Sequence, residues 1–108
     1  MDAATDDLSP ELIDRFKAFH AANPAVWLMF ERFALQAAAK LKHYSADAVM
    51  HRVRWYTHVE TVMDDFKINN NFVAFYARLF MYRHREHAGF FRLRTSAADD
   101  MIHRSLVE

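Results

Sequence analysis

The chain has 108 residues, a length that suits one domain, and 53% of them are hydrophobic, including ten Phe. This composition excludes a wholly disordered chain, and the absence of Cys excludes disulfide bonds and thiolate metal sites. The formal net charge is zero, so the total charge gives no indication of a nucleic-acid partner.

The N-terminal residues are acidic and lack the order of basic and then apolar residues that a signal peptide shows. We expect a disordered acidic N-terminus over residues 1–8 and a single helical domain over residues 9–108. The longest uncharged stretch, residues 18–30, is interrupted by polar residues and is shorter than the roughly 20 apolar residues that a bilayer requires. The lack of Cys fits a reducing compartment. We therefore expect a cytoplasmic protein with no membrane partner.

Two Pro residues mark the expected starts of the first two helices. Ser9 and Pro10 predict the first, because Ser caps free amide groups and Pro suits a first turn. Asn23 and Pro24 repeat this signal and predict a second helix over residues 24–42. Apolar residues recur along it with helical spacing, at Val26, Trp27, Phe30, Phe33, Ala34, Ala37 and Leu41.

Ser45 is the expected cap of a third helix, whose apolar face consists of Val49, Met50, Val53 and Tyr56. Residues 60–67 are predicted to form a loop. The three Asn residues after it are good caps and poor helix interiors, so they predict the start of a fourth helix over residues 70–86. Five apolar residues of that helix are expected to face inward: Phe72, Phe75, Tyr76, Leu79 and Phe80.

The only glycine, Gly89, follows the fourth helix as a stop signal does. Residues 90–94 then alternate apolar and basic side chains, a pattern that predicts a short strand. Ser96 and Asp99 form a capping-box pattern, which predicts a last helix over residues 97–106. The predicted fold is mostly α, a compact bundle of about five helices with a short β element, in an order similar to that of a winged-helix domain.

The charges are segregated along the chain, and this indicates a binding surface. Residues 40–59 contain four Lys and Arg against one Asp, and residues 67–94 contain six against one Glu. In a winged helix the second helix of the motif enters the major groove with its N-terminus first, where Asn can pair with adenine and Arg with guanine or phosphate. The predicted nucleic-acid-binding residues are Arg52, Arg54, Asn70, Asn71, Arg78, Arg92 and Arg94. The alternative is that the Asn run only caps a helix and the Arg residues form a solvated face.

The aromatic content, 15% of the chain, exceeds what one small core easily hides. One interpretation is a Phe-rich core, and the other is an exposed apolar patch that forms a homodimer or docks on a partner. Trp55 and Tyr82 lie nearest the polar helix faces, so they are the candidate interface residues.

Nothing in the sequence predicts catalysis or a cofactor. The chain has no Cys nucleophile, no Gly-rich phosphate loop and no Gly-x-Ser-x-Gly motif, so we expect no enzymatic activity. Seven His residues are present, and His84 and His87 lie one helical turn apart. Two ligands do not complete a zinc site, so we expect no bound metal.

Three segments resemble a pattern found in small uncharacterised bacterial and phage proteins. They are Phe66-Lys67-Ile68-Asn69-Asn70-Asn71, Tyr76-Ala77-Arg78-Leu79-Phe80-Met81 and Gly89-Phe90-Phe91-Arg92-Leu93-Arg94. The resemblance spans roughly residues 26–94. It implies a compact, phage-related helical domain and no catalytic residues.

Two functional hypotheses follow from the sequence. The first is a small non-enzymatic nucleic-acid-binding domain, a phage or bacterial regulator that contacts DNA. The second is a protein-interaction module, such as a phage-encoded inhibitor or adaptor that docks on a nucleic-acid-binding host protein. The segregated charge favours the first hypothesis, and the zero net charge favours the second.

Overall fold

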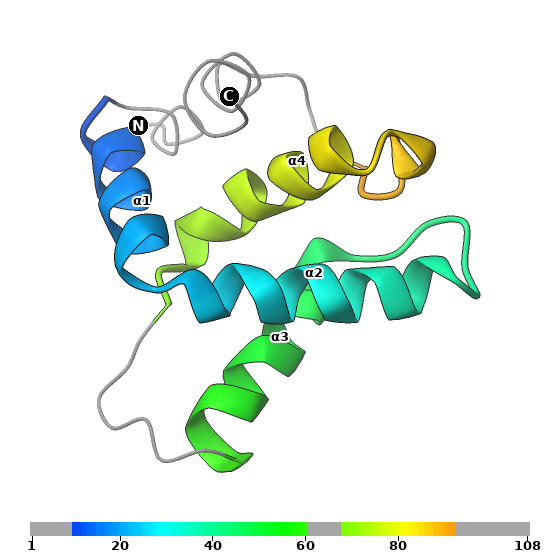
Figure 1. The fold of residues 1–108 in the computed structure, drawn as a ribbon, viewed down its shortest axis with the longest axis horizontal. Coiled ribbons are helices and arrows are strands. Elements are labelled where there is room, and N and C mark those ends of the chain that lie inside the picture. The colour runs from blue at the N-terminus through cyan, green and yellow to red at the C-terminus, as the bar shows by residue number, and fades with distance from the viewer. Residues whose placement is uncertain (1–9, 61–67, 93–108) are drawn as a thin grey trace.

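A computed structural model describes residues 10–60 and 68–92 of the chain. These residues form four α-helices: α1 (Pro10–Ala22), α2 (Pro24–Ala38), α3 (Ala46–Trp55) and α4 (Val73–Arg83). Short helical turns adjoin them at η2 (Tyr56–Glu60), η3 (Asn70–Phe72) and η4 (Arg85–His87). In Figure 1, α2 lies across the middle of the molecule, α4 lies above it, α3 runs steeply past it and α1 stands at one side. The prediction of a mostly α fold is confirmed.

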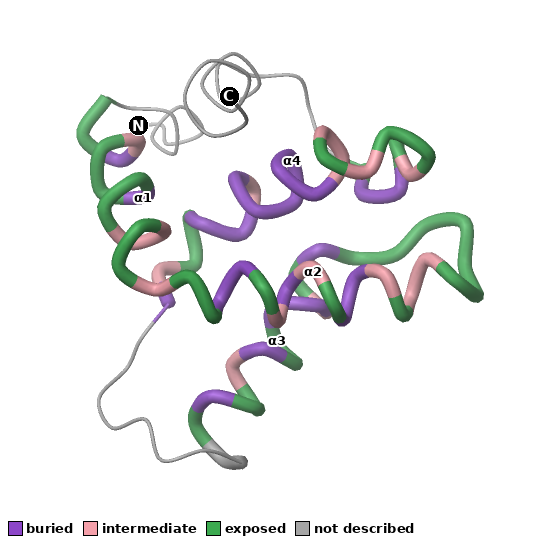
Figure 2. Tube along the Cα trace, in the orientation of Figure 1, coloured by how far each residue is buried: buried purple, intermediate pink, exposed green. Residues whose placement is uncertain are grey.

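The central helix of the core is α4. Seven of its eleven residues are buried, and Figure 2 shows the tube of this helix almost wholly in the colour of buried residues. All five residues predicted to face inward are buried, at 4% exposure or less: Phe72, Phe75, Tyr76, Leu79 and Phe80. Helices α1, α2 and α3 each place an apolar face against it.

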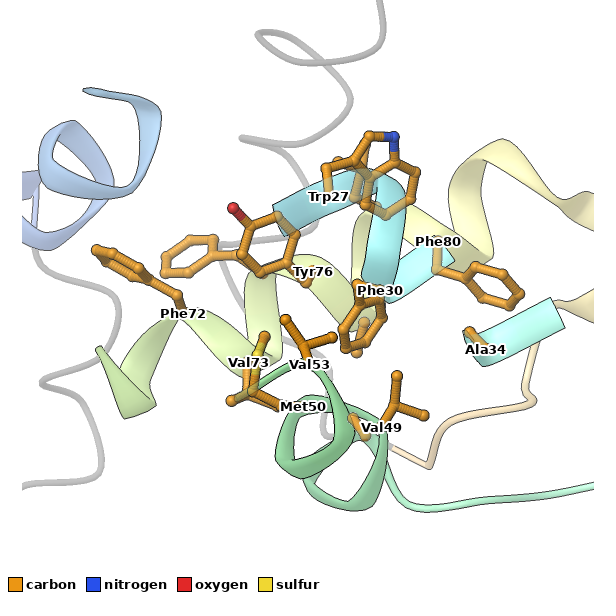
Figure 3. Packing of buried hydrophobic residues seen from close by; sticks show 14 of the residues in the cluster. Trp27, Phe30, Ala34, Val49, Met50, Val53, Phe72, Val73, Tyr76 and Phe80 are labelled. Carbon is orange, nitrogen blue, oxygen red and sulfur yellow. The ribbon is translucent and has the colours of Figure 1, made fainter. Parts of the chain in front are cut away.

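Aromatic rings fill the space between these helices. The Tyr76 ring of α4 lies 6.3 Å from that of Trp27 and 5.8 Å from that of Phe30, both on α2, between centroids (Figure 3). The Phe16 ring of α1 stacks on Phe75 at 4.7 Å. Such ring pairs contribute about 0.5–1.5 kcal/mol each beyond the burial of their area. The chain thus places a large share of its Phe residues in the core.

Local signals explain the helix starts. The Oγ atom of Ser45 accepts a hydrogen bond from the backbone amide of Ala48 at 3.1 Å, so Ser45 caps α3 as predicted. Pro24 opens α2 as expected, but the Asn23 side chain does not cap it. Instead the Nδ2 atom of Asn23 donates to the carbonyl of Phe19 at 3.0 Å and closes the end of α1.

Two helices are shorter than predicted. The second ends at Ala38 rather than at residue 42, because the chain turns there to reach α3. The predicted fourth helix is divided: its first residues form the 3₁₀ turn η3, which Asn69 caps, and its last residues form the separate 3₁₀ turn η4. Only the part between them is the α-helix α4.

The third helix continues into η2, a π-helical turn that includes residue 60, where the predicted loop begins. The wider turn changes which side chains face inward. Thr57 is fully buried, whereas Tyr56, predicted to face inward, is 41% exposed.

The predicted β element is not found in the part of residues 90–94 that the structure describes. Residues 90 and 91 form a bend, in which the Phe90 amide donates to the carbonyl of His87 at 2.9 Å. Both Phe90 and Phe91 are buried, at 3% and 2% exposure, whereas a strand would turn consecutive side chains to opposite faces. Residues 93 and 94, the predicted last helix over 97–106 and the acidic N-terminus over 1–8 lie outside the described residues.

Candidate functional site

The fourth helix does not present the exposed face that a recognition helix needs. Residues of a recognition helix must reach base edges, so they must be open to solvent. The side chains of α4 are covered by α1, α2 and α3 over most of its length. Arg78, predicted to bind nucleic acid, is only 8% exposed, and its Nη1 atom donates to the carbonyl of Ala74 at 3.1 Å. Arg78 therefore belongs to the core of the fold rather than to an open surface.

Three of the predicted nucleic-acid-binding residues, Asn70, Asn71 and Arg92, do lie together. They line an open groove of about 700 Å³ between the start of α3, the start of α4 and the segment of residues 91–92. His43 and Asp47 are also on its wall. The groove thus has a polar rim with one Arg, one His and one carboxylate.

Arg54 is held beside this groove by the Asn run. Its Nη2 atom donates to the Oδ1 atom of Asn70 at 2.5 Å and to the carbonyl of Ile68 at 3.4 Å. The neighbouring Asn69 has a capping role, since its Oδ1 atom accepts from the Asn71 amide at 2.8 Å. Part of the Asn run therefore caps a helical turn, as in the alternative interpretation of the sequence, in which the run only caps a helix.

Arg52 lies on another face of α3. Residues two apart on a helix point in nearly opposite directions, and Arg52 accordingly faces α2 rather than Asn70. Its guanidinium carbon lies 4.4 Å from the centroid of the Phe33 ring, a cation–π contact between α3 and α2. The structure therefore separates Arg52 from Arg54 and Arg92, and Arg94 lies outside the described residues.

The surface around Arg52 contains two adjoining hollows, of about 360 and about 280 Å³. Both are lined by Phe33, Gln36 and Arg52, and we call them together the α2–α3 groove. The larger hollow is further lined by Ala37, Lys40, Leu41, Tyr44, Ala48 and Val49, and the smaller by Met29, Arg32, Trp55 and Tyr56. The groove therefore joins apolar walls to three cations.

The two predicted interface residues lie at different places. Trp55 is 58% exposed and lines the smaller hollow of the α2–α3 groove. Tyr82 is only partly exposed, near the end of α4, with the guanidinium carbon of Arg85 4.5 Å from its ring centroid. Figure 1 places the end of α4 and the end of α3 at opposite sides of the molecule. Trp55 and Tyr82 therefore do not form one patch.

Sequence reasoning missed Leu41, Tyr44 and Tyr56, which are 46%, 43% and 41% exposed and line the same groove. Leu41 was assigned to an apolar helix face, and the early end of α2 leaves it in an exposed turn. A sequence signal existed only for Tyr44, an aromatic residue directly before the Ser45 cap. The contact of Phe33 with Arg52 joins residues far apart in sequence, so no local pattern indicates it.

Two titratable side chains with shifted pKa values, His20 and Tyr76, line neither groove. Burial lowers the pKa of His20 below its usual value of 6.5, and the nearby charge of Arg83 lowers it further. Burial also raises the pKa of the Tyr76 hydroxyl. Their rings are 5.8 Å apart, between α1 and α4. These groups belong to the packing of the core.

No protein-family model, curated protein or solved structure matches this chain. Within residues 10–60 and 68–92, no group of three or more His, Cys, Asp and Glu is placed to hold a metal ion. None of the described helices is both long enough and apolar enough to cross a bilayer.

Proposed function

We propose that this protein is a non-enzymatic interaction domain that docks on a protein partner through the α2–α3 groove. The observation that carries the proposal is the clustering of large apolar side chains in solvent. Among the described residues, five large hydrophobic side chains are exposed, and four of them line this groove: Leu41, Tyr44, Trp55 and Tyr56. Exposed apolar patches of this kind are typical of surfaces that bind a partner.

The chemistry of the groove also supports docking. Tyr, Trp and Arg are the residue types most enriched among those that dominate binding energy, and Trp55, Tyr56 and Arg52 line one hollow. Covering one such aromatic side chain stabilises a complex by roughly 2 kcal/mol through loss of apolar area from water. Two hollows beside these side chains can receive side chains of the partner.

Capture from a bacterial lysate tests the proposal with three forms of the full chain. The first is the native chain, and the second carries Trp55→Ala and Tyr56→Ala. The third carries Leu28→Ala, a matched control, because Leu28 is 59% exposed and lines neither hollow. We expect a stoichiometric partner that the native chain and the control retain and the double variant loses. Equal retention by all three, or no partner, argues against the proposal.

We propose nucleic-acid binding as a second candidate function, on a different geometry from the one that the sequence predicted. It is favoured by the groove of about 700 Å³ whose wall contains Asn70, Asn71, His43 and Arg92. In this geometry the N-terminal end of α4, rather than a face along the whole helix, would contact the nucleic acid. Arg54, hydrogen bonded to Asn70, would stay beside it, and Arg94 remains part of this proposal.

Fluorescence anisotropy with labelled duplex and single-stranded oligonucleotides tests the second candidate. Phosphate contacts weaken steeply with salt, so binding at low salt should fall as salt rises. Arg92→Ala should weaken binding to all sequences and reduce the salt dependence, whereas Lys17→Ala on the exposed face of α1 should not. Absence of binding at low salt excludes this candidate.

A further inference from the structure

The charged residues that line the α2–α3 groove are all positive. Arg32, Lys40 and Arg52 line its two hollows, and none of its lining residues is an Asp or a Glu. Arg32 and Lys40 are exposed, so their charges face solvent beside the apolar walls. An incoming surface that buries this groove must supply carboxylates, because a neutral or basic surface would cover the cations without compensation.

The two hollows lie at different heights along α2. Met29 of α2 lines only the smaller one and Ala37 of α2 only the larger one, and eight residues on a helix correspond to about 12 Å. Apolar side chains at positions i and i+7 of a helix are separated by nearly the same distance, about 10 Å. A helix lying along the groove can therefore place one apolar side chain in each hollow, as helices bound in grooves do.

We propose that the α2–α3 groove binds an acidic amphipathic helix of a partner protein. Apolar side chains two turns apart enter the two hollows, and carboxylates of the helix pair with Arg32, Lys40 and Arg52. The inference rests on the proposed docking function and names the class of partner. Trp55 and Tyr56 cover the apolar face of the bound helix at the smaller hollow.

A second copy of this chain fits the groove less well. A two-fold symmetric pair places the same patch of each copy against the other. The cations of one groove would then face the cations of the other, with no carboxylate in the lining to separate them. Charge complementarity therefore favours a different, acidic partner.

Single-stranded nucleic acid also combines negative charge with flat rings, which stack on exposed aromatic residues. The larger hollow, however, has Ala37, Leu41 and Val49 on its wall beside Tyr44, and these aliphatic side chains suit a branched aliphatic side chain better than the plane of a base. The Phe33 ring is already covered on one face by Arg52. The groove thus fits apolar peptide side chains better than bases.

Selection from a displayed library of helical peptides tests the inference. The peptides have about 16 residues, long enough to lie along α2, and their exposed positions are randomised. Against the full chain we expect enrichment of acidic peptides with apolar residues at i and i+7. Enrichment of basic or neutral peptides, or no enrichment, overturns the inference.

Fluorescence anisotropy then locates the binding of the enriched acidic peptide. Lys40→Glu should weaken it about tenfold, and so should Trp55→Ala. The matched control is Lys17→Glu, which reverses an exposed charge on α1 and should leave the affinity unchanged. Circular dichroism of each variant confirms that the fold is retained. Equal affinity for all variants overturns the inference, and so does an oligo(dT) probe that binds in a Trp55-dependent manner and displaces the peptide.

The two experiments distinguish the inference from the proposed function. If lysate capture depends on Trp55 and Tyr56 but no acidic helix is selected, the docking function stands and the acidic class of partner is wrong. If capture shows no dependence on these residues and the selection also fails, both are wrong.

Discussion

The Nε2 atom of His84 lies 2.7 Å from the Oε2 atom of Glu31, and this contact joins the end of α4 to the middle of α2. Both side chains are only partly exposed, at 20% and 24%. The His84 ring also packs on Phe80, with centroids 4.8 Å apart. The pair therefore fixes the polar end of the central helix against the helix that forms one wall of the α2–α3 groove.

We expect the Glu31 and His84 side chains to be energetically coupled. In a double-mutant cycle of Glu31→Ala and His84→Ala, the coupling energy should be about 1 kcal/mol, the value of a partly buried hydrogen bond. Urea denaturation of the four proteins measures it. Glu86 is a control, because it is 65% exposed and lies 3.9 Å from His84, so its coupling should be within about 0.5 kcal/mol of zero. A coupling near zero for Glu31 contradicts the expectation.

The buried hydroxyl of Tyr76 gives a second prediction. Tyr76 is fully buried, and its oxygen has no hydrogen-bond partner among the described residues. Tyr76→Phe should therefore leave the free energy of unfolding unchanged or raise it by up to about 1 kcal/mol. Tyr76→Ala should lower it by about 3–5 kcal/mol, since it leaves a cavity beside Trp27 and Phe30. Guanidinium denaturation measures both, and a clear loss of stability for Tyr76→Phe indicates that the hydroxyl does have a partner.

The helices were predictable from the sequence because their signals are local. The Ser45 cap and the apolar spacing of Phe72, Phe75 and Tyr76 depend only on neighbouring residues, and the structure confirms them. Local spacing identifies an inward face, but it does not show that a second side of α4 is also covered. For that reason Arg78 was assigned to a solvent-exposed surface, whereas it is buried.

The candidate binding surfaces were predictable only in part. Trp55 was identified because it lies next to the polar face of α3, and its side chain is indeed exposed. The remainder of the α2–α3 groove depends on how α3 crosses α2, which brings Arg52 onto Phe33. The strand expected over residues 90–94 rested on alternation of apolar and basic residues. Packing overrode that pattern at Phe90 and Phe91, since both enter the core.

The protonation of His20 gives a prediction of pH dependence. Its ring stacks on Phe16 at 5.6 Å, and burial followed by the charge of Arg83 lowers its pKa below 6.5. The unfolded chain, with the higher pKa, binds the proton first as the pH falls. The free energy of unfolding should therefore decrease as the pH falls through about 6.5, and this decrease should end below the pKa of folded His20.

The variant His20→Leu isolates this contribution, because it removes the buried imidazole and leaves every other residue of the chain unchanged. Denaturation at about pH 7.5, 6.5 and 5.5 should show a shallower loss of stability in the variant than in the native chain. NMR titration of the His20 ring should give a pKa below 6.5, the usual value for His. Identical pH profiles for the two proteins would contradict the prediction.

The turn at Gly89 determines how the chain returns to the core after α4. Gly89 has φ of 87°, a left-handed conformation that L side chains rarely adopt, and an added Cβ atom would meet no atom within 4 Å. Gly89→Ala should therefore cost about 1–2 kcal/mol through backbone strain alone, with no steric component. Gly89→Asn should cost less, because Asn tolerates this conformation better. Thermal denaturation of the two variants gives this order, and equal costs would show that the backbone conformation is not the cause.

The same turn positions the segment that bounds the groove of about 700 Å³. After Gly89, the carbonyl of Phe90 accepts a hydrogen bond from the Tyr44 amide at 3.3 Å, and Phe91 and Arg92 then line the groove. Loss of the turn should loosen this attachment as well as lower stability. In Gly89→Ala, amide hydrogen exchange at Tyr44 should accelerate more than exchange at Val53 in the core of α3. If both amides accelerate by the same factor, the variant lowers global stability only, and the turn has no separate role in holding the segment before α3.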